Sequence, residues 1–464
     1  MFGRRGFSIT RTQLTPRYAR RLSASTGRGR ERRGYGAGPV RLSRPASLEL
    51  VGTCSTAPAE PISDEQVRLA TRATYLVFIG SGVALASWAS RIPQVRTHFH
   101  LDPSELGFVL LAIAAGSVVS LPLSGPVIAR FESRRTVSAM AVLLSLGLAM
   151  VAAGYLISLA VVVVGLFVLG LANGAWDVAM NVHGAAVERE LGRSILPRFH
   201  AGWSLGSVVG ALVGVVMVVM GVPVTAHLAV VAVLVAITMP LATRRFIPSN
   251  GATASAEEDT ARAGDGTEGR RRTFAAWREP RTLAVGVFVL AFAFAEGTGN
   301  DWISVASIGG YHVAAAVGTV LFATFLAAMT VGRWFAPTLL DRYGRVPVVR
   351  CLAITAITGV ALFVFGPAAP VAFVGVLLWG AGTSVGFPLG MSAGADDPRM
   401  AASRVSVIAS IGYCAFLGGP PLIGFLGDHV TVLHAMIAVA ALLAVATMLA
   451  PAVRKPSPAP VSID

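Results

Sequence analysis

Residues 125–135 read GPVIARFESRR and residues 337–345 read PTLLDRYGR, and each stretch separates two long apolar runs. Arg130 aligns with Arg342 at an offset of 212 residues. Each stretch lies between the second and third apolar run of its own half of the chain. The sequence therefore predicts an internal repeat of two halves with six apolar runs each. Parallel six-helix repeats of this kind are a known transporter architecture, with substrate held near the midplane between the halves.

The apolar runs are long enough to cross a bilayer. The 464 residues are 54% hydrophobic and only 13% charged, whereas soluble proteins have roughly 25% charged residues. About 20 apolar residues cover a hydrocarbon core of about 30 Å as a helix. The runs show no period-two alternation, which excludes barrel strands and leaves helices. Twelve transmembrane helices are expected at about 72–92, 105–128, 136–156, 158–181, 199–220, 223–243, 283–305, 313–337, 347–366, 369–391, 405–426 and 431–451.

The expected fold class is an all-α membrane protein with two pseudo-symmetric six-helix bundles and both termini in the cytoplasm. The expected segments are a disordered Arg-rich tail at 1–69, the first bundle at 70–247, a cytoplasmic linker at 248–282, the second bundle at 283–453 and a tail at 454–464.

Loop charges predict the orientation, because cytoplasmic loops carry an excess of Lys and Arg. With the N-terminus inside, every inner loop is basic, and among the outer loops only the first has arginines, Arg91 and Arg96. The pattern favours an even number of spans in the plasma membrane, which is the inner membrane of a bacterium.

The N-terminal tail holds twelve arginines and one acid within residues 1–45. It is compatible with a transit peptide, a nucleic-acid arm, a lipid-surface anchor, or a solvated tail or over-extended start without a role. The last is favoured, and no nucleic-acid partner is expected. A cleaved secretory signal is not expected, because no apolar segment follows the early arginines.

Glu296 is a candidate for proton coupling. An ionisable residue inside a membrane helix is costly and marks a functional site by default. Glu296 lies mid-span beside Phe292 and Phe294, and apolar surroundings make protonation near neutral pH feasible. The alternative is a permanently neutral Glu that forms a structural hydrogen bond. Asn300, one turn further on the same face, is a candidate for binding substrate.

Asn173, Asp177 and Asn181 have i, i+4, i+8 spacing, so they share one face of the fourth predicted helix. Such a polar stripe faces either a wet cavity or another helix, where it would hold helices together. Asp177 is a second candidate for proton coupling, and the two asparagines are candidates for substrate binding.

Other polar residues of the spans have two interpretations each. Arg333 either reaches the membrane interface or pairs with substrate or the coupling carboxylate. Trp88 and Arg91 are interface anchors or part of an outer gate and binding site, and Asp301 and Trp302 are similar.

The chain lacks a nucleotide-binding glycine loop, paired metal ligands and a nucleophile constellation, so neither an enzyme nor a cofactor is expected. Its three cysteines, Cys54, Cys351 and Cys414, show no metal or disulfide spacing and are expected to be free thiols.

The stretch at 341–345 resembles the inter-helix signature of the major facilitator superfamily. The copy at 125–135 departs from it, with Ala129 in place of the usual acid and Glu132 in place of the usual glycine. Four further stretches resemble a mostly uncharacterised bacterial inner-membrane branch related to fucose-permease-type sugar–proton symporters: residues 87–93 (SWASRIP), 173–181 (NGAWDVAMN), 198–206 (RFHAGWSLG) and 296–302 (EGTGNDW).

The resemblance implies an inner gate whose charges bond helix ends across the interface in one state and release them in another. The residues expected there are Asp341, Arg342, Gly344, Arg345, Arg130 and Arg333. It also implies a secondary transporter, here expected to be a monomer in membrane lipid, that moves a small-molecule substrate, sugar-like by resemblance only, together with protons. The alternatives are a drug or metabolite exporter of the same superfamily and a non-transporting receptor or scaffold, which would have no reason to keep Glu296 and the Asn/Asp stripe.

Overall fold

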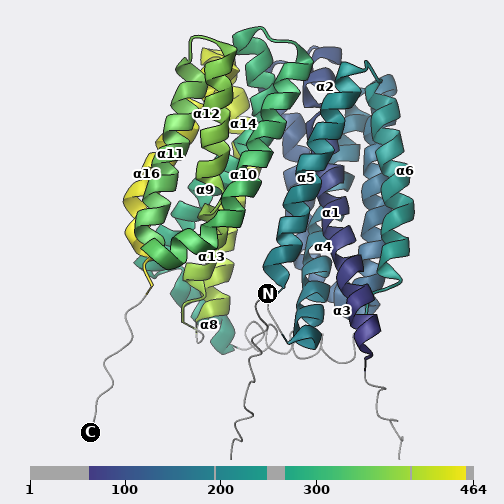
Figure 1. Cartoon of the computed structure of the whole chain (residues 1–464), viewed down its shortest axis with the longest axis vertical. Coiled ribbons are helices and arrows are strands. Elements are labelled where there is room, and N and C mark those ends of the chain that lie inside the picture. Colours follow the sequence, from purple (N-terminus) through teal and green to yellow (C-terminus); the bar gives the residue numbers. More distant parts are fainter. Residues whose placement is uncertain (1–61, 193–194, 248–266, 398–399, 456–464) are drawn as a thin grey trace, which may run out of the picture. The chain divides into compact units, whose positions relative to one another are not determined.

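The computed structural model describes residues 62–192, 195–247, 267–397 and 400–455, which all belong to one compact unit, residues 59–464. The regular elements in these ranges are all helices (Figure 1). They are α1 (Asp64–Ala89), α2 (Ile92–His98), α3 (Pro103–Ile157), α4 (Leu159–Leu191), α5 (Leu196–Val219), α6 (Val224–Thr243), α8 (Thr267–Ala276), α9 (Pro280–Tyr311), α10 (Ala315–Tyr343), α11 (Arg345–Phe365), α12 (Ala369–Thr383), α13 (Gly386–Gly394), α14 (Ala401–Val430), α15 (Val432–Ala435), α16 (Ile437–Leu449) and the 3-10 turn η1 (Ala450–Val453).

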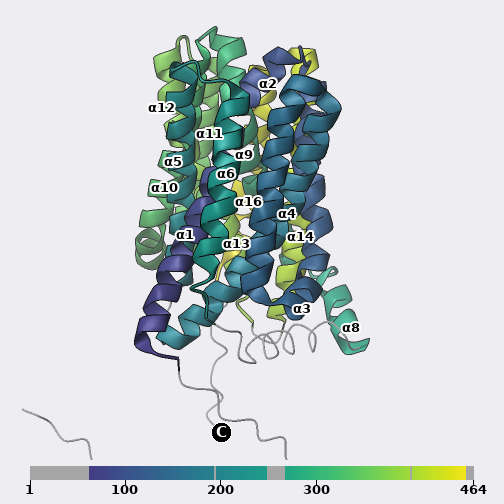
Figure 2. The ribbon, with the colours of Figure 1, turned by 90° about the vertical axis from the view of Figure 1, so that its right-hand side faces the viewer.

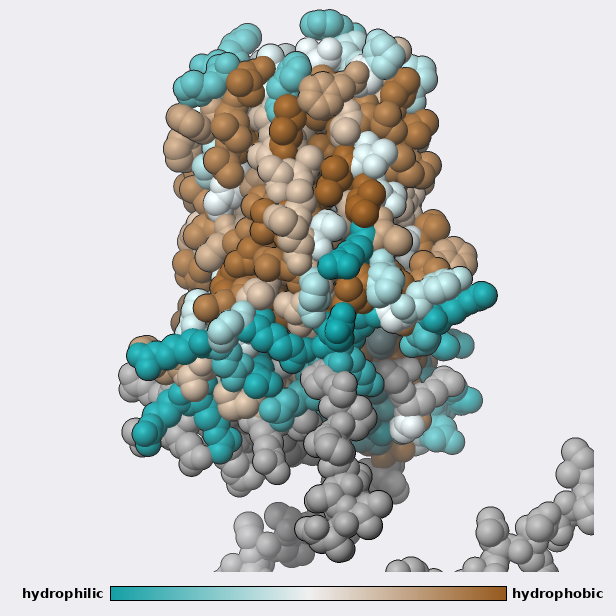
Figure 3. Space-filling model, turned by 90° about the vertical axis from the view of Figure 1, so that its left-hand side faces the viewer, coloured by the Kyte–Doolittle hydropathy of each residue, from teal (hydrophilic) through white to brown (hydrophobic). Residues whose placement is uncertain are grey.

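Within the described ranges, eleven helical stretches are long and apolar enough to cross a membrane. Large hydrophobic side chains remain exposed along them, and on the face shown in Figure 3 they form a band bounded by hydrophilic side chains. A monomeric soluble protein rarely exposes so large an apolar surface. The chain is therefore a multi-pass membrane protein, as the apolar runs predicted.

Two expected spans, 105–128 and 136–156, lie together in α3, which is 55 residues long. A straight helix of that length would extend about 80 Å at 1.5 Å per residue, far more than the bilayer core. At Glu132 the backbone of α3 (φ 63°, ψ 157°) is not helical, and the helix is broken there. The break separates residues 103–131 from residues 133–157, and each part has the length of one span.

The structure moves two expected boundaries. Helix α1 begins at Asp64 rather than near residue 70, because Ser63 and Gln66 form a capping box. Helix α8 lies inside the expected linker 248–282, of which residues 248–266 fall outside the described ranges. The disorder expected for residues 1–61 falls outside them too, as does Cys54. Cys351 and Cys414 are free, as expected.

Helices pack closely where glycine removes the side chain. A Cβ at Gly206 of α5 would collide with the Ile79 carbonyl of α1, so the two backbones approach to a distance that only glycine permits. The first half, α1 to α6, and the second half, α9 to α16, meet through α5 with α10 and α3 with α14. Figures 1 and 2 show α2 at one end of the bundle and α8 at the other. We call these ends the α2 end and the α8 end.

Candidate functional site

Glu296 and Arg333 form an ion pair inside the helical bundle. Arg333 Nη2 of α10 donates to Glu296 Oε1 of α9 at 2.8 Å. The Arg333 side chain is 26% exposed and the Glu296 side chain is 14% exposed. The neighbouring Phe292, Phe294 and Ala295 are buried. Arg333 therefore pairs with the membrane carboxylate, which was one of its two predicted interpretations. This pair is the only ion pair among the described residues whose two members both lie well inside long helices.

The Arg333 guanidinium also connects the two halves of the chain. Its Nε donates to the Ser384 carbonyl oxygen at the end of α12, at 3.2 Å. Its Nη1 donates to Ser204 Oγ of α5, in the first half, at 3.3 Å. One side chain therefore links α9, α12 and α5 to α10.

The α4 stripe continues this polar region on the first half. Asn173 Oδ1 accepts from Ser81 Oγ of α1 at 3.4 Å. Asn181 Nδ2 donates to the carbonyl oxygen of Asp177 at 2.9 Å and lies 3.3 Å from its Oδ1. Asn181 Oδ1 lies 3.0 Å from His200 Nε2 of α5. The three predicted stripe residues are half-buried and share one helix face.

Tyr413 of α14, in the second half, lies within electrostatic range of Asp177. The stripe therefore lies at the interface between the halves.

Four residues that the motifs did not single out also belong to this region: His200, Ser204, Ser384 and Tyr413. His200 and Ser204 lie in the stretch 198–206 and are four residues apart, so they occupy one face of α5. That spacing could have identified them from the sequence. Ser384 contributes only a backbone carbonyl, and no sequence pattern could have identified it.

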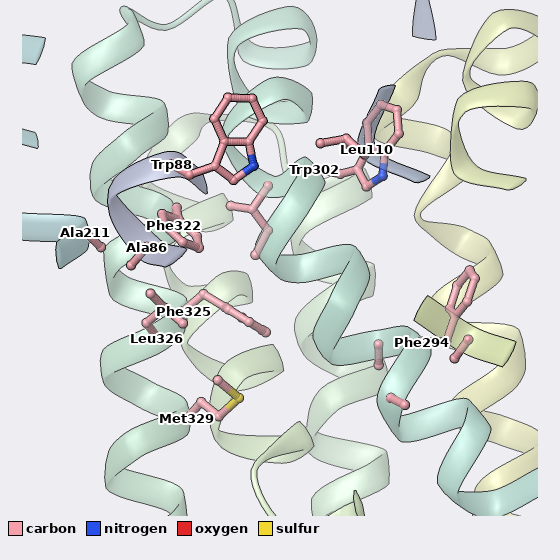
Figure 4. Close-up of a cluster of buried hydrophobic side chains, with 14 of the residues drawn as sticks. Ala86, Trp88, Leu110, Ala211, Phe294, Trp302, Phe322, Phe325, Leu326 and Met329 are labelled. Atoms are coloured by element: carbon pink, nitrogen blue, oxygen red, sulfur yellow. The ribbon is translucent and has the colours of Figure 1, made fainter. Parts of the chain in front are cut away.

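Towards the α2 end, the interface between the halves is apolar. Figure 4 shows a buried cluster with members from both halves, among them Trp88, Leu110, Phe325 and Trp302. Trp88 and Trp302 are buried, and so do not serve as anchors at the lipid surface. In α9, the atoms Thr298 Oγ1, Asn300 Oδ1 and Trp302 Nε1 are buried and have no hydrogen-bond partner among the described groups. Asp301 is half-buried.

Arg91 lies away from these residues, in contact with α6. It is 2% exposed, and its Nε donates to His227 Nδ1 at 2.9 Å. The pair stays within the first half of the chain. Burial excludes the interface-anchor interpretation of Arg91.

The halves are tied together at the α2 end. The Asp428 carboxylate of α14 accepts from the backbone N–H of Ser104 at 3.4 Å, and also bonds its hydroxyl. Ser104 lies in the first turn of α3, where unpaired N–H groups and the helix dipole favour a negative charge. Gly107 and Gly424 allow α3 and α14 to pack backbone against backbone in the same region.

The residues expected to form a gate lie at the α8 end. Arg130, Asp341, Arg342 and Gly344 are exposed, and no ion pair joins them to the opposite half within the described ranges. Arg342 instead lies over the ring of Tyr343, 5.3 Å from its centroid. The structure does not bring these residues together with Glu296, whereas Arg333 is part of the central site.

Arg345 is bound within the second half. Its Nη1 contacts both oxygens of Asp396, at 2.9 and 3.0 Å, and Arg281 Nη2 contacts the same carboxylate at 2.9 Å. At the same end, Glu279 pairs with Arg404 Nε at 2.6 Å. The hydrogen bond from Arg404 holds the pKa of Glu279 below its ordinary value.

No cluster of His, Cys, Asp and Glu in the described ranges has the geometry of a metal site.

Comparison with known proteins agrees with this architecture. The chain is 29% identical over 382 residues to the uncharacterized transporter y4wD of Sinorhizobium fredii, which covers 82% of this chain and 96% of that protein. The fold is similar to the nucleoside transporter NupG, with a TM-score of 0.66 and 16% identity over 84% of this chain and 98% of that one. It is also similar to the E. coli fucose:proton symporter FucP, with a TM-score of 0.55 and 15% identity over 84% of this chain and 99% of that one.

A family model confirms the superfamily that the stretch at 341–345 resembles. The family model of the Major Facilitator Superfamily matches residues 74–418, about three quarters of the chain, and the chain belongs to this superfamily of transporters.

Proposed function

We propose that this chain is a proton-coupled secondary transporter that moves a small polar, sugar-like solute by alternating access. The observation that carries the proposal is the Arg333 guanidinium, which binds the Glu296 carboxylate in one half and Ser204 in the other. A group that joins the coupling carboxylate to the opposite half can transmit a change of charge into a movement of helices. The proposal includes twelve spans, counting the two parts of α3 separately, with the α8 end and both termini in the cytoplasm.

The charge balance of the pair supports proton coupling. With Glu296 ionised, its negative charge holds Arg333 close to α9. A proton on Glu296 would cancel that charge and leave Arg333 free to change its partners and to release Ser204 of α5. Placing an arginine and a carboxylate inside a membrane bundle costs free energy, and such residues therefore mark functional sites. Asp177, which lies at the interface near Tyr413, is the second proposed proton-binding carboxylate.

A polar solute is supported by three buried groups of α9, within two helical turns of Glu296, that have no hydrogen-bond partner among the described residues. Thr298, Asn300 and Trp302 each have a buried polar atom without a hydrogen bond among the described residues, and leaving such atoms unpaired costs about 1–3 kcal/mol each. Hydroxyl groups of a solute could satisfy donors and acceptors alike.

The proposed binding set is completed by Asn173, Asn181, Asp301 and Trp88. The likeness to FucP, named a fucose:proton symporter, agrees with a sugar-like solute. Arg91 is also proposed to bind the solute, at the α2 end, where it pairs with His227.

The two ends would alternate as gates. In this conformation Asp428 and Ser104 join the halves at the α2 end, whereas Asp341 and Arg130 at the α8 end are exposed. The pair Glu296–Arg333 would then be reached from the cytoplasm. Closing the α8 end would bring Asp341, Arg342 and Arg130 into contact with helix ends of the opposite half, with Gly344 as the turn and Arg345 released from Asp396.

The test is solute-dependent proton flux into proteoliposomes across a panel of sugars, polyols and nucleosides. We expect at least one panel member to drive proton movement in the wild type, and Glu296→Gln and Asp177→Asn to weaken it. The matched control is Glu279→Gln, which also neutralises an ion-paired carboxylate adjoining α9 but lies outside the proposed site. Normal, pH-dependent flux in both site variants would overturn the coupling proposal.

A further inference from the structure

His200 adjoins the central polar region on the side of the α8 end. It is in the first turns of α5, is exposed, and precedes Ser204 by four residues, so both face the same side of the helix. Ser204 accepts the hydrogen bond from Arg333. His200 is therefore one helical turn closer to the α8 end than the contact that joins α5 to α10.

The contacts of His200 fix which ring nitrogen carries hydrogen. Asn181 Nδ2 is directed at Asp177, so Asn181 Oδ1 faces His200 and accepts from Nε2 at 3.0 Å. The hydrogen of neutral His200 is then on Nε2, and Nδ1 is left as the nitrogen that can take up a proton. The ring also packs edge-on against Phe78 of α1, with 5.2 Å between centroids, which limits how far it can turn.

The charged and titratable groups near His200 come from three neighbouring helices and its own. Arg333 of α10 lies within electrostatic range. Asp177 of α4 is linked to His200 by Asn181, which contacts both. Tyr75 of α1 packs against Phe199, the residue before His200. Arg198 is the charged residue on α5 itself. No carboxylate forms an ion pair with His200 in the part of the chain that the structure describes, and Arg333 is the positive charge that acts on it from the second half.

We propose that His200 is the protonation site at the α8 end that controls the α5–α10 contact, and this inference rests on the proposed function of the Glu296–Arg333 site. A proton from solvent binds Nδ1, and the neutral imidazole becomes an imidazolium with hydrogen on both nitrogens. The imidazolium repels Arg333, because two positive charges then face each other across the interface. The repulsion opposes the Arg333–Ser204 bond and moves α5 away from α10. Desolvation of the ring and the facing Arg333 both favour the neutral imidazole of His200, so the imidazolium forms towards the acid side of the range, pH 5 to 8, in which histidine ordinarily changes its charge.

His200 is thus a positioning residue that acts through Arg333. An acidic cytoplasm would separate α5 from α10, whereas an alkaline one would let the 3.3 Å contact between Arg333 and Ser204 form. Glu296 would bind the transported proton, and His200 would set the cytoplasmic pH at which α5 separates from α10.

The experiment measures the α5–α10 distance directly, without a solute. Spin labels at Leu205→Cys and Thr338→Cys, two exposed positions, are introduced after replacing Cys54, Cys351 and Cys414 by alanine, and distances are recorded at pH 5.5 and 8.0. We expect the wild type to shift by about 2 Å towards longer distance at pH 5.5. His200→Gln, never charged, should stay short at both pH values, and His200→Lys, always charged, should stay long.

A control shows that the response belongs to this histidine. His434→Gln removes an exposed histidine at the α2 end and should leave the pH response unchanged. A wild-type distance that does not depend on pH, or a full response in His200→Gln, would overturn the proposal. Because no solute is present, a pH response without any detectable transport would leave His200 as the switch and remove the transport proposal instead.

Discussion

Glu132 and Gly344 occupy equivalent positions in the two copies of the repeat and have nearly the same backbone conformation. Glu132 has φ 63° and ψ 157°, and Gly344 has φ 78° and ψ 165°. The two are 212 residues apart, the offset that aligns Arg130 with Arg342. The first copy of the signature has therefore lost its glycine but kept the turn that glycine makes easy.

The first prediction concerns this turn. Glu132→Gly should stabilise the protein by about 1 kcal/mol, because a residue with a Cβ is strained at this φ and ψ. The midpoint of thermal unfolding in detergent should rise. Glu132→Ala keeps the Cβ and should bring no such gain, so equal stabilisation by Ala and Gly would contradict the strain.

The second prediction separates the two members of the central ion pair. Arg333→Met should destabilise the protein by about 2 kcal/mol, because it leaves the Glu296 carboxylate without its partner. The double variant Arg333→Met with Glu296→Met should recover part of that loss. Unfolding of the wild type, both single variants and the double variant gives the coupling energy of the pair. Strictly additive effects would mean that the two charges do not stabilise each other.

The third prediction tests the closure of the α2 end. Asp428→Asn removes the charge that accepts from Ser104 of the other half, a bond worth about 1 kcal/mol at an exposed site. The population of molecules open at the α2 end should rise about fivefold. It would be visible as a longer-distance component in the distance distribution between spin labels at Phe108 and Phe425. Glu190→Gln, which removes an exposed acid elsewhere, is the control. Unchanged distances in Asp428→Asn would remove Asp428 from the gate.

The fourth prediction concerns acid stability at the α8 end. The pKa of Glu279 is lower in the folded chain than its ordinary value of 4.5. Its ionised form therefore stabilises the fold at pH values above 4.5, and this contribution disappears as the pH falls through the lowered pKa. The Glu279 side chain is 30% exposed and water screens part of its charge, so the contribution should be below about 1 kcal/mol. In unfolding measured from pH 7 to pH 3, Glu279→Gln should be less stable than the wild type at pH 7, and the gap should close at pH 3.

Much of the fold could be predicted from the sequence because lipid imposes a simple pattern. Apolar runs of fixed length predicted the helices, and the aligned residues Arg130 and Arg342 predicted the two halves. The start of α1 was missed, although Ser63 and Gln66 have the spacing of a capping box. The linker helix α8 was missed too, because a short polar helix has no strong apolar period.

The candidate site was harder to predict, because its contacts join residues far apart in the chain. Glu296 and the α4 stripe were recognisable as costly polar groups inside apolar helices. That Arg333 meets both Glu296 and Ser204 depends on how α5, α9 and α10 pack, which periodicity does not encode. The four-residue spacing of His200 and Ser204 places both on one face of α5, but the importance of His200 comes from Arg333 on another helix, which that spacing does not show.

The central claim is that Glu296 couples solute movement to protons. The most direct test compares two activities of Glu296→Gln in proteoliposomes, with a solute identified on the panel: accumulation driven by a proton gradient, and exchange of labelled for unlabelled solute without a gradient. Exchange needs the helices to move with bound solute, whereas accumulation also needs a proton to bind and leave. We predict that Glu296→Gln retains exchange and loses accumulation. Accumulation at the wild-type level in this variant would contradict the account.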